Sequence, residues 1–179
     1  MKRISNATSK TIDDQCAEYS ERVLNLIREN ASKMELSYDN VASHLRISYE
    51  MAKRILSGGS CRVTAALLLR TLSWVSFNKP LYNPKVSVIT DAYGEEVKAW
   101  RKSLGYSKEE VAEMLGVSKT MLKNLEEGIF KPSIKTMLAV REVTRINFEV
   151  FFVEKLIEMS DDSELSWEML NVAGHLRKF

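Results

Sequence analysis

Residues that interrupt helices are few in this chain, which has seven glycines and three prolines among 179 residues. Leucine, glutamate, lysine and eight methionines favour helices instead, so the composition predicts an all-α fold. No uninterrupted apolar run approaches the roughly 18 residues that a membrane span needs. Residues 1–15 carry charge but no apolar core, unlike a signal peptide. We therefore expect a cytoplasmic protein with no membrane partner.

Residues that bind metals or carry out covalent chemistry are equally scarce. Cys16 and Cys61 are the only cysteines and lack the spacing of a metal site, so we expect reduced thiols. His44 and His175 lie apart from each other and from both cysteines. The sequence contains no glycine-rich phosphate loop and no credible nucleophile–base pair. These absences predict that the chain is not an enzyme and has no metal, no cofactor and no evident small-molecule effector.

Charge is distributed unevenly along the chain. Residues 1–79 contain 12 Lys and Arg against 8 Asp and Glu, a net charge of +4. Residues 80–160 contain 12 of each, and residues 161–179 contain 2 against 4. Such modest values permit a nucleic-acid partner without requiring one, so the local placement of the charges has to decide.

The sequence repeats itself once, with one constant offset between the two copies and no gap. Matched positions carry the same or a similar residue in both copies. The pairs are Ser37 and Ser107, Val41 and Val111, Ala42 and Ala112, Leu45 and Leu115, Ile47 and Val117, Ser48 and Ser118, Ile55 and Leu125, and Gly58 and Gly128. With only two copies, the pattern predicts a duplicated unit and not a solenoid.

The second copy has the sequence signals of two short helices joined by a tight turn. Ser107 and Glu110 form a capping box that begins the first helix. Gly116 ends that helix, because glycine reaches the left-handed conformation without a Cβ penalty. Ser118 caps the next helix, and Gly128 ends it. The residues expected to be buried at helical spacing are Val111, Ala112, Leu115, Leu122 and Leu125, with Val117 at the corner. This pattern predicts a helix-turn-helix.

The segment LGYSKEEVAEMLGVSKTMLKNLEEGIFKPS resembles the Cro-like, phage-repressor type of helix-turn-helix domain. The likeness runs from Val97 through Pro132 and into the following helix. The earlier copy, LSYDNVASHLRISYEMAKRILSGGS, resembles the family less closely, since Arg46 replaces the turn glycine. The resemblance implies two tandem lambda-repressor-like helix-turn-helix bundles plus C-terminal helices, and it suggests a mobile-element or phage setting. The expected segments are a first domain over 11–78, a linker over 79–90, a second domain over 91–144 and a C-terminal helical dimerisation segment over 145–179.

In this family the helix after the turn lies in the major groove. The outward residues expected to read bases are Lys119, Thr120, Lys123 and Asn124 in the second copy and Tyr49, Glu50, Lys53 and Arg54 in the first. Lysine can donate to guanine, asparagine can bond adenine and a threonine methyl can contact thymine. The alternative for each set is a solvated helix face. Glu50 suits a polyanion only if it reads cytosine.

Phosphate contacts are expected beside these helices, and Lys108 takes a position where the family usually has a phosphate-contacting glutamine. The expected residues are Ser107, Lys108, Lys131 and Lys135 in the second copy and Ser37, Tyr38, Ser60 and Arg62 in the first. The resemblance also implies a structural ion pair between Arg101 and Glu126. The offset partners of these two residues in the first copy, Ala31 and Leu56, are both uncharged.

The sequence also predicts the structure of two segments outside the helix-turn-helix copies, residues 79–90 and residues 145–179. Lys85 to Thr90 alternates like a short strand, so residues 79–90 form either a linker or an edge strand that pairs with another subunit. Residues 145–179 hold 5 of the chain's 15 aromatics, and they are apolar on more than one helical face. The aromatics are Phe148, Phe151, Phe152, Trp167 and Phe179. Core packing plus a homodimer through residues 145–179 is favoured over a pocket for an aromatic effector.

These features together favour a sequence-specific, DNA-binding transcriptional regulator, such as a repressor, with two reading heads per chain and double-stranded DNA as its partner. The alternative is a protein-interaction module of the antitoxin or anti-activator type that reuses the helix-turn-helix scaffold. Salt distinguishes the two, because phosphate binding weakens steeply with salt and an apolar protein interface does not.

Overall fold

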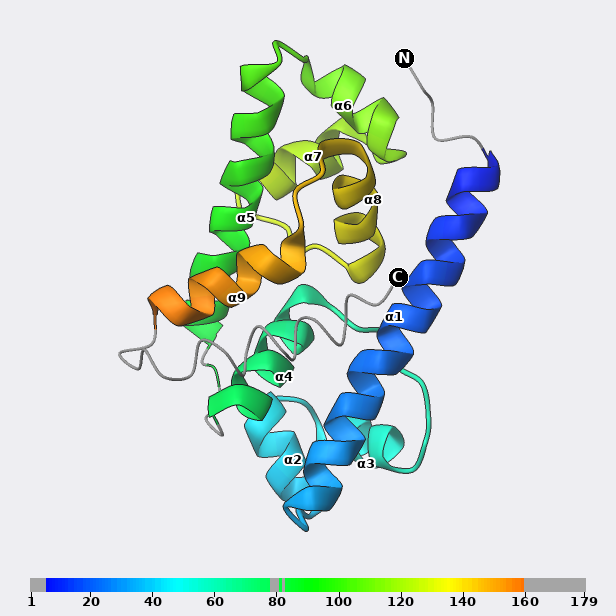
Figure 1. Ribbon diagram of the computed structural model, residues 1–179, viewed down its shortest axis with the longest axis vertical. Coiled ribbons are helices and arrows are strands. Elements are labelled where there is room, and N and C mark those ends of the chain that lie inside the picture. The colour runs from blue at the N-terminus through cyan, green and yellow to red at the C-terminus, as the bar shows by residue number, and fades with distance from the viewer. Residues whose placement is uncertain (1–5, 78–80, 82, 160–179) are drawn as a thin grey trace.

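The computed structural model describes residues 6–77, 81 and 83–159 (Figure 1). Within these residues the fold is all-α, as predicted, with a single isolated β-bridge between Thr64 and Ser133. The helices are α1 (Asn6–Lys33), α2 (Tyr38–Leu45), α3 (Tyr49–Leu56), α4 (Ala65–Phe77), α5 (Asn83–Ser103), α6 (Lys108–Leu115), α7 (Lys119–Glu126), α8 (Ile134–Thr144) and α9 (Phe148–Glu158). We refer to α1–α4 as unit 1 and to α5–α8 as unit 2.

The turn between α6 and α7 forms as its residues predict. The side chain of Ser107 accepts a hydrogen bond from the Glu110 amide, and the Glu110 carboxylate accepts one from the Ser107 amide. Gly116 ends α6 in the left-handed region, at φ 67° and ψ 30°. Ser118 then caps α7 by accepting a hydrogen bond from the Met121 amide. Each of these signals depends only on near neighbours in the chain, which is why the sequence alone predicts the turn.

The turn between α2 and α3 has the same geometry although it lacks the glycine. Arg46 takes the left-handed conformation, at φ 53° and ψ 47°, where a non-glycine residue is disfavoured by roughly 1–2 kcal/mol. Ser37 caps α2 and Ser48 caps α3. The Arg70 guanidinium of α4 donates to the carbonyl oxygen of Leu45 at 3.3 Å, and this bond helps to hold the end of α2. Arg46 therefore adds backbone strain, but the turn keeps the left-handed geometry of the turn at Gly116.

The two units share helix packing and a single core. α1 packs against α8 of unit 2 as well as against α3 and α4 of its own unit, and α5 packs against α4 of unit 1 as well as against α7 and α8. The segments that lead into α4 and α8 run antiparallel at the bridge, where the Ala65 amide donates to the Pro132 carbonyl at 3.1 Å. One hydrophobic cluster includes buried residues from both units. Each unit therefore covers part of the other's apolar surface.

Residues 83–90 are helical, so both alternatives for this stretch, the linker and the short edge strand over Lys85 to Thr90, are wrong. Helix α5 begins at Asn83, and Val86 and Ile89 are completely buried. The apolar period continues through Tyr93 and Val97, which are also buried. This spacing of three or four residues is helical. Val86 and Val88 gave a false strand signal, because Val88 is exposed and does not belong to the buried face.

Helix α9 completes the core of the same chain. It packs against α5 and α4, and its residues Phe148, Phe152 and Val153 are fully buried. The ring of Phe152 lies 5.6 Å from that of Tyr93 on α5. The core packing expected for this segment is therefore present in α9, and these buried residues are not available to a second chain. Residues 160–179, which include the other part of the expected dimerisation segment, lie outside the described residues.

Candidate nucleic-acid interface

Helix α7 has one buried face and one polar outward face. Leu122 and Leu125 are buried, with at most 1% of their surface exposed. The side chains of Lys119 and Lys123 are 61% and 55% exposed. Thr120 is exposed as well, and Asn124 is half-buried. The four residues expected to read bases thus lie on the side of α7 opposite the core, where a partner can contact them.

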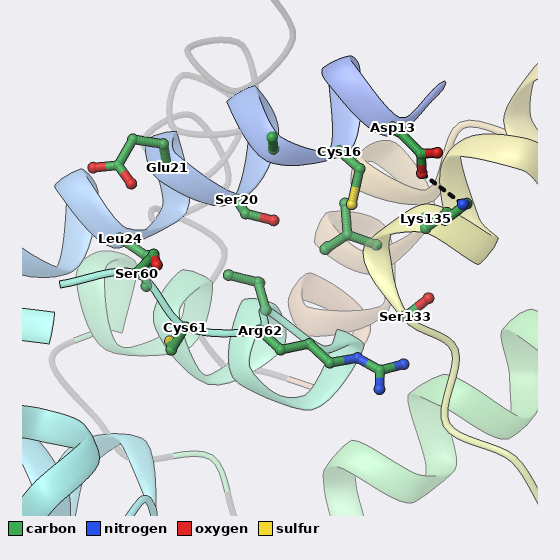
Figure 2. Close-up of a pocket in the computed structure, with 13 residues that line it drawn as sticks. Asp13, Cys16, Ser20, Glu21, Leu24, Ser60, Cys61, Arg62, Ser133 and Lys135 are labelled. Carbon is green, nitrogen blue, oxygen red and sulfur yellow. Dashed lines mark ion pairs between the residues drawn. The ribbon is translucent and has the colours of Figure 1, made fainter. Parts of the chain in front are cut away.

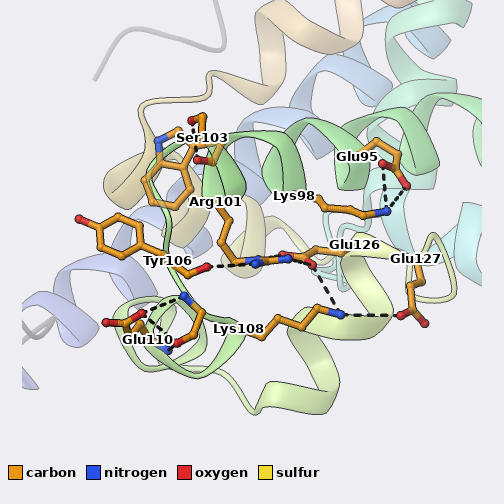
Figure 3. Close-up of polar contacts among 11 residues, drawn as sticks. Glu95, Lys98, Arg101, Ser103, Tyr106, Lys108, Glu110, Glu126 and Glu127 are labelled. Carbon is orange, nitrogen blue, oxygen red and sulfur yellow. Dashed lines mark hydrogen bonds and ion pairs between the residues drawn. The ribbon is translucent and has the colours of Figure 1, made fainter.

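Carboxylates neutralise the lysines on this side of unit 2. Lys119 forms an ion pair with Glu109, and Lys123 lies 3.9 Å from Glu127. Lys108 lies 3.8 Å from a carboxylate oxygen of Glu127 and 3.8 Å from one of Glu126 (Figure 3). The hydrogen bond from Lys119 holds the pKa of Glu109 below its ordinary value. Sequence reasoning missed these pairs, although the i,i+4 spacing of Lys123 and Glu127 was a usable signal.

The outward face of α3 in unit 1 has a different chemistry. Its residues Tyr49, Glu50, Lys53 and Arg54 are all exposed. The ring of Tyr49 meets that of Tyr38 edge to face, with centroids 5.9 Å apart. In the part of the chain that the structure describes, neither Lys53 nor Arg54 has a carboxylate within ion-pair distance. Unit 1 therefore presents unpaired cations beside an exposed aromatic pair.

A buried ion pair joins α5 to α7 behind the outward face (Figure 3). The Arg101 Nε donates to Glu126 Oε1 at 2.6 Å, and Nη2 donates to Oε2 at 2.9 Å. A third hydrogen bond runs from Arg101 Nη1 to the Tyr106 carbonyl at 3.0 Å. Only 8% of Arg101 and 1% of Glu126 are exposed, and the hydrogen bonds to Glu126 raise the pKa of Arg101. The ion pair that the resemblance implied is present, and it fixes α7 on α5.

Unit 1 uses a different residue at the corresponding place. Arg28 of α1 donates from Nε to the carbonyl of Ile55 at 2.7 Å and from Nη2 to the carbonyl of Gly59 at 3.1 Å. These bonds join α1 to the end of α3 and to the turn that follows it. Ala31 and Leu56 of unit 1 correspond to Arg101 and Glu126 and carry no charge. Arg28, one helical turn before Ala31, connects α1 to α3 in place of that ion pair.

Gly94 allows α5 and α7 to approach closely. A Cβ atom at this position would lie 2.0 Å from the carbonyl oxygen of Leu125. Sequence reasoning did not single out this residue, although an isolated glycine within a helical pattern often marks close packing. Gly94 and the Arg101–Glu126 pair together determine where the outward face of α7 lies relative to α5.

Three residues expected to contact phosphate lie around a pocket of about 570 Å³ (Figure 2). They are Lys135, at the start of α8, and Ser60 and Arg62, in the segment before α4. Both cysteines also line this pocket, and α1 forms its opposite wall. Lys135 is paired with Asp13 of α1 at 2.5 Å. Of the other expected phosphate contacts, Lys131, Ser37, Tyr38 and Ser107 are exposed, and Lys108 is half-buried.

Comparison with known proteins identifies one family and relatives of this chain. Residues 97–151 match a family model described as helix-turn-helix. The chain is 35% identical over 80 residues to the HTH-type transcriptional regulator SinR of Bacillus subtilis (strain 168), an alignment that covers 43% of this chain and 71% of that protein. It is 34% identical over 80 residues to the HTH-type transcriptional regulator SinR of Bacillus licheniformis, covering 44% of this chain and 71% of the relative. No solved structure matches the chain. No helix among the described residues is both long and apolar enough to cross a membrane.

Proposed function

Because the chain belongs to the helix-turn-helix family of transcriptional regulators, we propose that it binds specific DNA sequences through two reading heads, unit 1 and unit 2. The observation that carries this proposal is the outward face of α7, where Lys119, Thr120, Lys123 and Asn124 stand opposite a buried leucine face. A short helix held in this way after a tight turn fits the major groove. Its lysine, threonine and asparagine side chains match the hydrogen-bonding and methyl groups of base edges.

Unit 1 serves in this proposal as a second head with a different preference. The turn between α2 and α3 has the geometry of the turn between α6 and α7, and the whole outward set of α3 is exposed. Tyr49 and Arg54 stand where unit 2 has Lys119 and Asn124. Two heads with different reading residues recognise two different half-sites, so we expect an asymmetric DNA site for each chain.

One observation favours a protein partner for unit 1 instead. Tyr38 and Tyr49 form an exposed aromatic pair at the leading edge of α2 and α3, and tyrosine is enriched in protein interfaces. In that case unit 1 recruits a protein while unit 2 binds DNA. Replacing both tyrosines by alanine separates the two readings, because only a DNA-reading role predicts weaker binding to naked DNA.

Lys119→Ala and Asn124→Ala are each expected to lose discrimination among DNA sites by about 1–3 kcal/mol, because each removes hydrogen bonds to base edges. The measurement is competition binding of a DNA fragment selected by the wild-type protein against random fragments. Lys85→Ala, near the start of α5 and also exposed, is the control for the loss of one lysine. Unchanged discrimination in both variants would exclude α7 as the reading helix.

We also propose that the chain forms a homodimer through residues 145–179. With α9 buried in its own chain, the support for a dimer comes from the apolar residues that follow it in the sequence, such as Trp167. Light scattering at micromolar concentration should give twice the 20.5 kDa of one chain. A mass near 20.5 kDa would mean that the two heads of a single chain bind DNA as a pseudo-dimer.

A further inference from the structure

Every lysine on the DNA-facing side of α6 and α7 already has a carboxylate beside it. Glu109 pairs with Lys119, and Glu127 lies within 4.0 Å of both Lys108 and Lys123. Glu126, the third carboxylate, is engaged by Arg101 in the buried pair. Glu109 and Glu127 are both exposed, so neither is required to balance a charge in the core. We call these two residues the carboxylate pair.

The carboxylate pair belongs to unit 2 alone. At the constant offset of the repeat, Asp39 corresponds to Glu109, but the residue that corresponds to Lys119 is Tyr49. Ser57 corresponds to Glu127, so Lys53 has no carboxylate one helical turn later. Within residues 6–77, 81 and 83–159, Lys53 and Arg54 form no ion pair. The two units thus differ in whether their cations are free to meet a phosphate.

Exposed ion pairs of this kind contribute little to folding stability, because water and salt screen them. They have a larger consequence for a polyanionic partner. On DNA of any sequence, a phosphate that approaches Lys108, Lys119 or Lys123 must replace a carboxylate, and the displaced carboxylate stays nearby with the same sign of charge as the phosphate. Lys119 and Lys123 must also leave their carboxylates before they can reach base edges at a selected site. The penalty therefore applies to every DNA sequence, because phosphates carry no sequence information.

We propose that Glu109 and Glu127 act as internal competitors of DNA phosphate, which lower the affinity of unit 2 for every DNA sequence and leave unit 1 to make the first electrostatic contact. This inference rests on the proposed DNA-binding function. The two carboxylates thereby weaken DNA binding, whereas the lysines beside them strengthen it. Unit 2 then engages mainly on DNA that unit 1 has already bound, where the local concentration of phosphate is high.

The test compares the DNA affinity of full-length Glu109→Gln and Glu127→Gln variants with that of the wild type. The probes are a duplex selected by the wild-type protein and a random duplex of equal length, each from 50 to 200 mM salt. Each variant should bind both duplexes about two- to fivefold more tightly at the lower salt, the range of one surface ion pair. The slope of log affinity against log salt should steepen by up to about 0.9 for each lysine freed.

Two controls separate this effect from a change in overall charge. Glu154→Gln removes one exposed carboxylate from α9. Asp39→Asn removes the offset equivalent of Glu109, and Asp39 forms no ion pair with any residue that the structure describes. If the Glu109 and Glu127 variants gain no more affinity than these controls, the carboxylates do not compete with phosphate. A gain on the selected duplex alone would also overturn the inference, because it would indicate base readout.

A double-mutant cycle tests whether Glu109 acts through its partner. When Lys119 is replaced by methionine, Glu109→Gln should raise the affinity by less than it does in the wild type. An equal gain in both backgrounds would show that Glu109 repels DNA directly, without competing for Lys119. If the wild type itself binds neither duplex at 50 mM salt, the proposed function fails. If it binds and the cycle shows no coupling, only this inference fails.

Discussion

Arg101→Ala is expected to lower the free energy of unfolding by about 3–5 kcal/mol, the range for removing one partner of a buried ion pair. Glu126 is 1% exposed and would lose the two hydrogen bonds that Arg101 donates, which leaves a buried carboxyl group without its partner. Lys108 does not replace them, because its Nζ lies 3.8 Å from Glu126 and an ammonium cannot form the bidentate pair. The carbonyl of Tyr106 would also lose the hydrogen bond from Arg101. Urea unfolding followed by circular dichroism measures the loss.

Three further variants identify the source of this loss. Arg62→Ala removes an exposed arginine and should change stability by less than about 0.5 kcal/mol, as surface substitutions usually do. Arg101→Lys should lie between alanine and the wild type, because an ammonium cannot form the bidentate pair. Arg101→Met combined with Glu126→Leu should recover most of the stability, since apolar residues of similar volume often replace a buried pair without loss. A loss in Arg101→Ala no larger than that in Arg62→Ala would show that the pair contributes nothing.

Gly94→Ala is expected to lower the free energy of unfolding, which is the opposite of the usual result for this substitution within a helix. Alanine in place of glycine within a helix normally stabilises a protein by up to about 1 kcal/mol. Here the new Cβ would lie 2.0 Å from the Leu125 carbonyl oxygen, so α5 and α7 would have to move apart. Overpacking of this kind destabilises by about 1–3 kcal/mol, and more where the obstacle is backbone.

An exposed position on the same helix provides a matched control. Ala99→Gly should show the ordinary preference of helices for alanine, with a loss of about 1 kcal/mol. In Gly94→Ala the movement of α7 should also weaken DNA binding, because the reading residues leave their place relative to α5. Stabilisation by Gly94→Ala, measured by the same urea unfolding, would show that the helices are not in close contact at this point.

The parts of the site that sequence predicted are those set by neighbouring residues. Ser107, Gly116 and Ser118 determine the turn through hydrogen bonds and backbone conformation within a few residues. Arg46 shows the limit of such rules. It takes the left-handed conformation in place of a glycine, because packing on both sides of the turn outweighs the local preference.

The parts that sequence did not predict depend on contacts between distant segments. Nothing near Gly94 in the sequence indicates that Leu125 will approach it, and nothing near Arg28 indicates the carbonyl of Ile55. The same holds for Lys135, whose expected phosphate role took no account of Asp13 on α1. Residue pairs of this kind become visible only once the helices are packed against one another in three dimensions.

The contact between α1 and α8 also constrains how the protein folds during synthesis. α1 is complete at Lys33, but the helix that covers part of its apolar face begins only at Ile134. Until α8 leaves the ribosome, that face of the nascent chain stays open to water and to other chains. Contacts between residues so far apart in sequence form late, because the intervening chain must first lose its conformational entropy. The packing of unit 1 is therefore completed only after α8 has been synthesised.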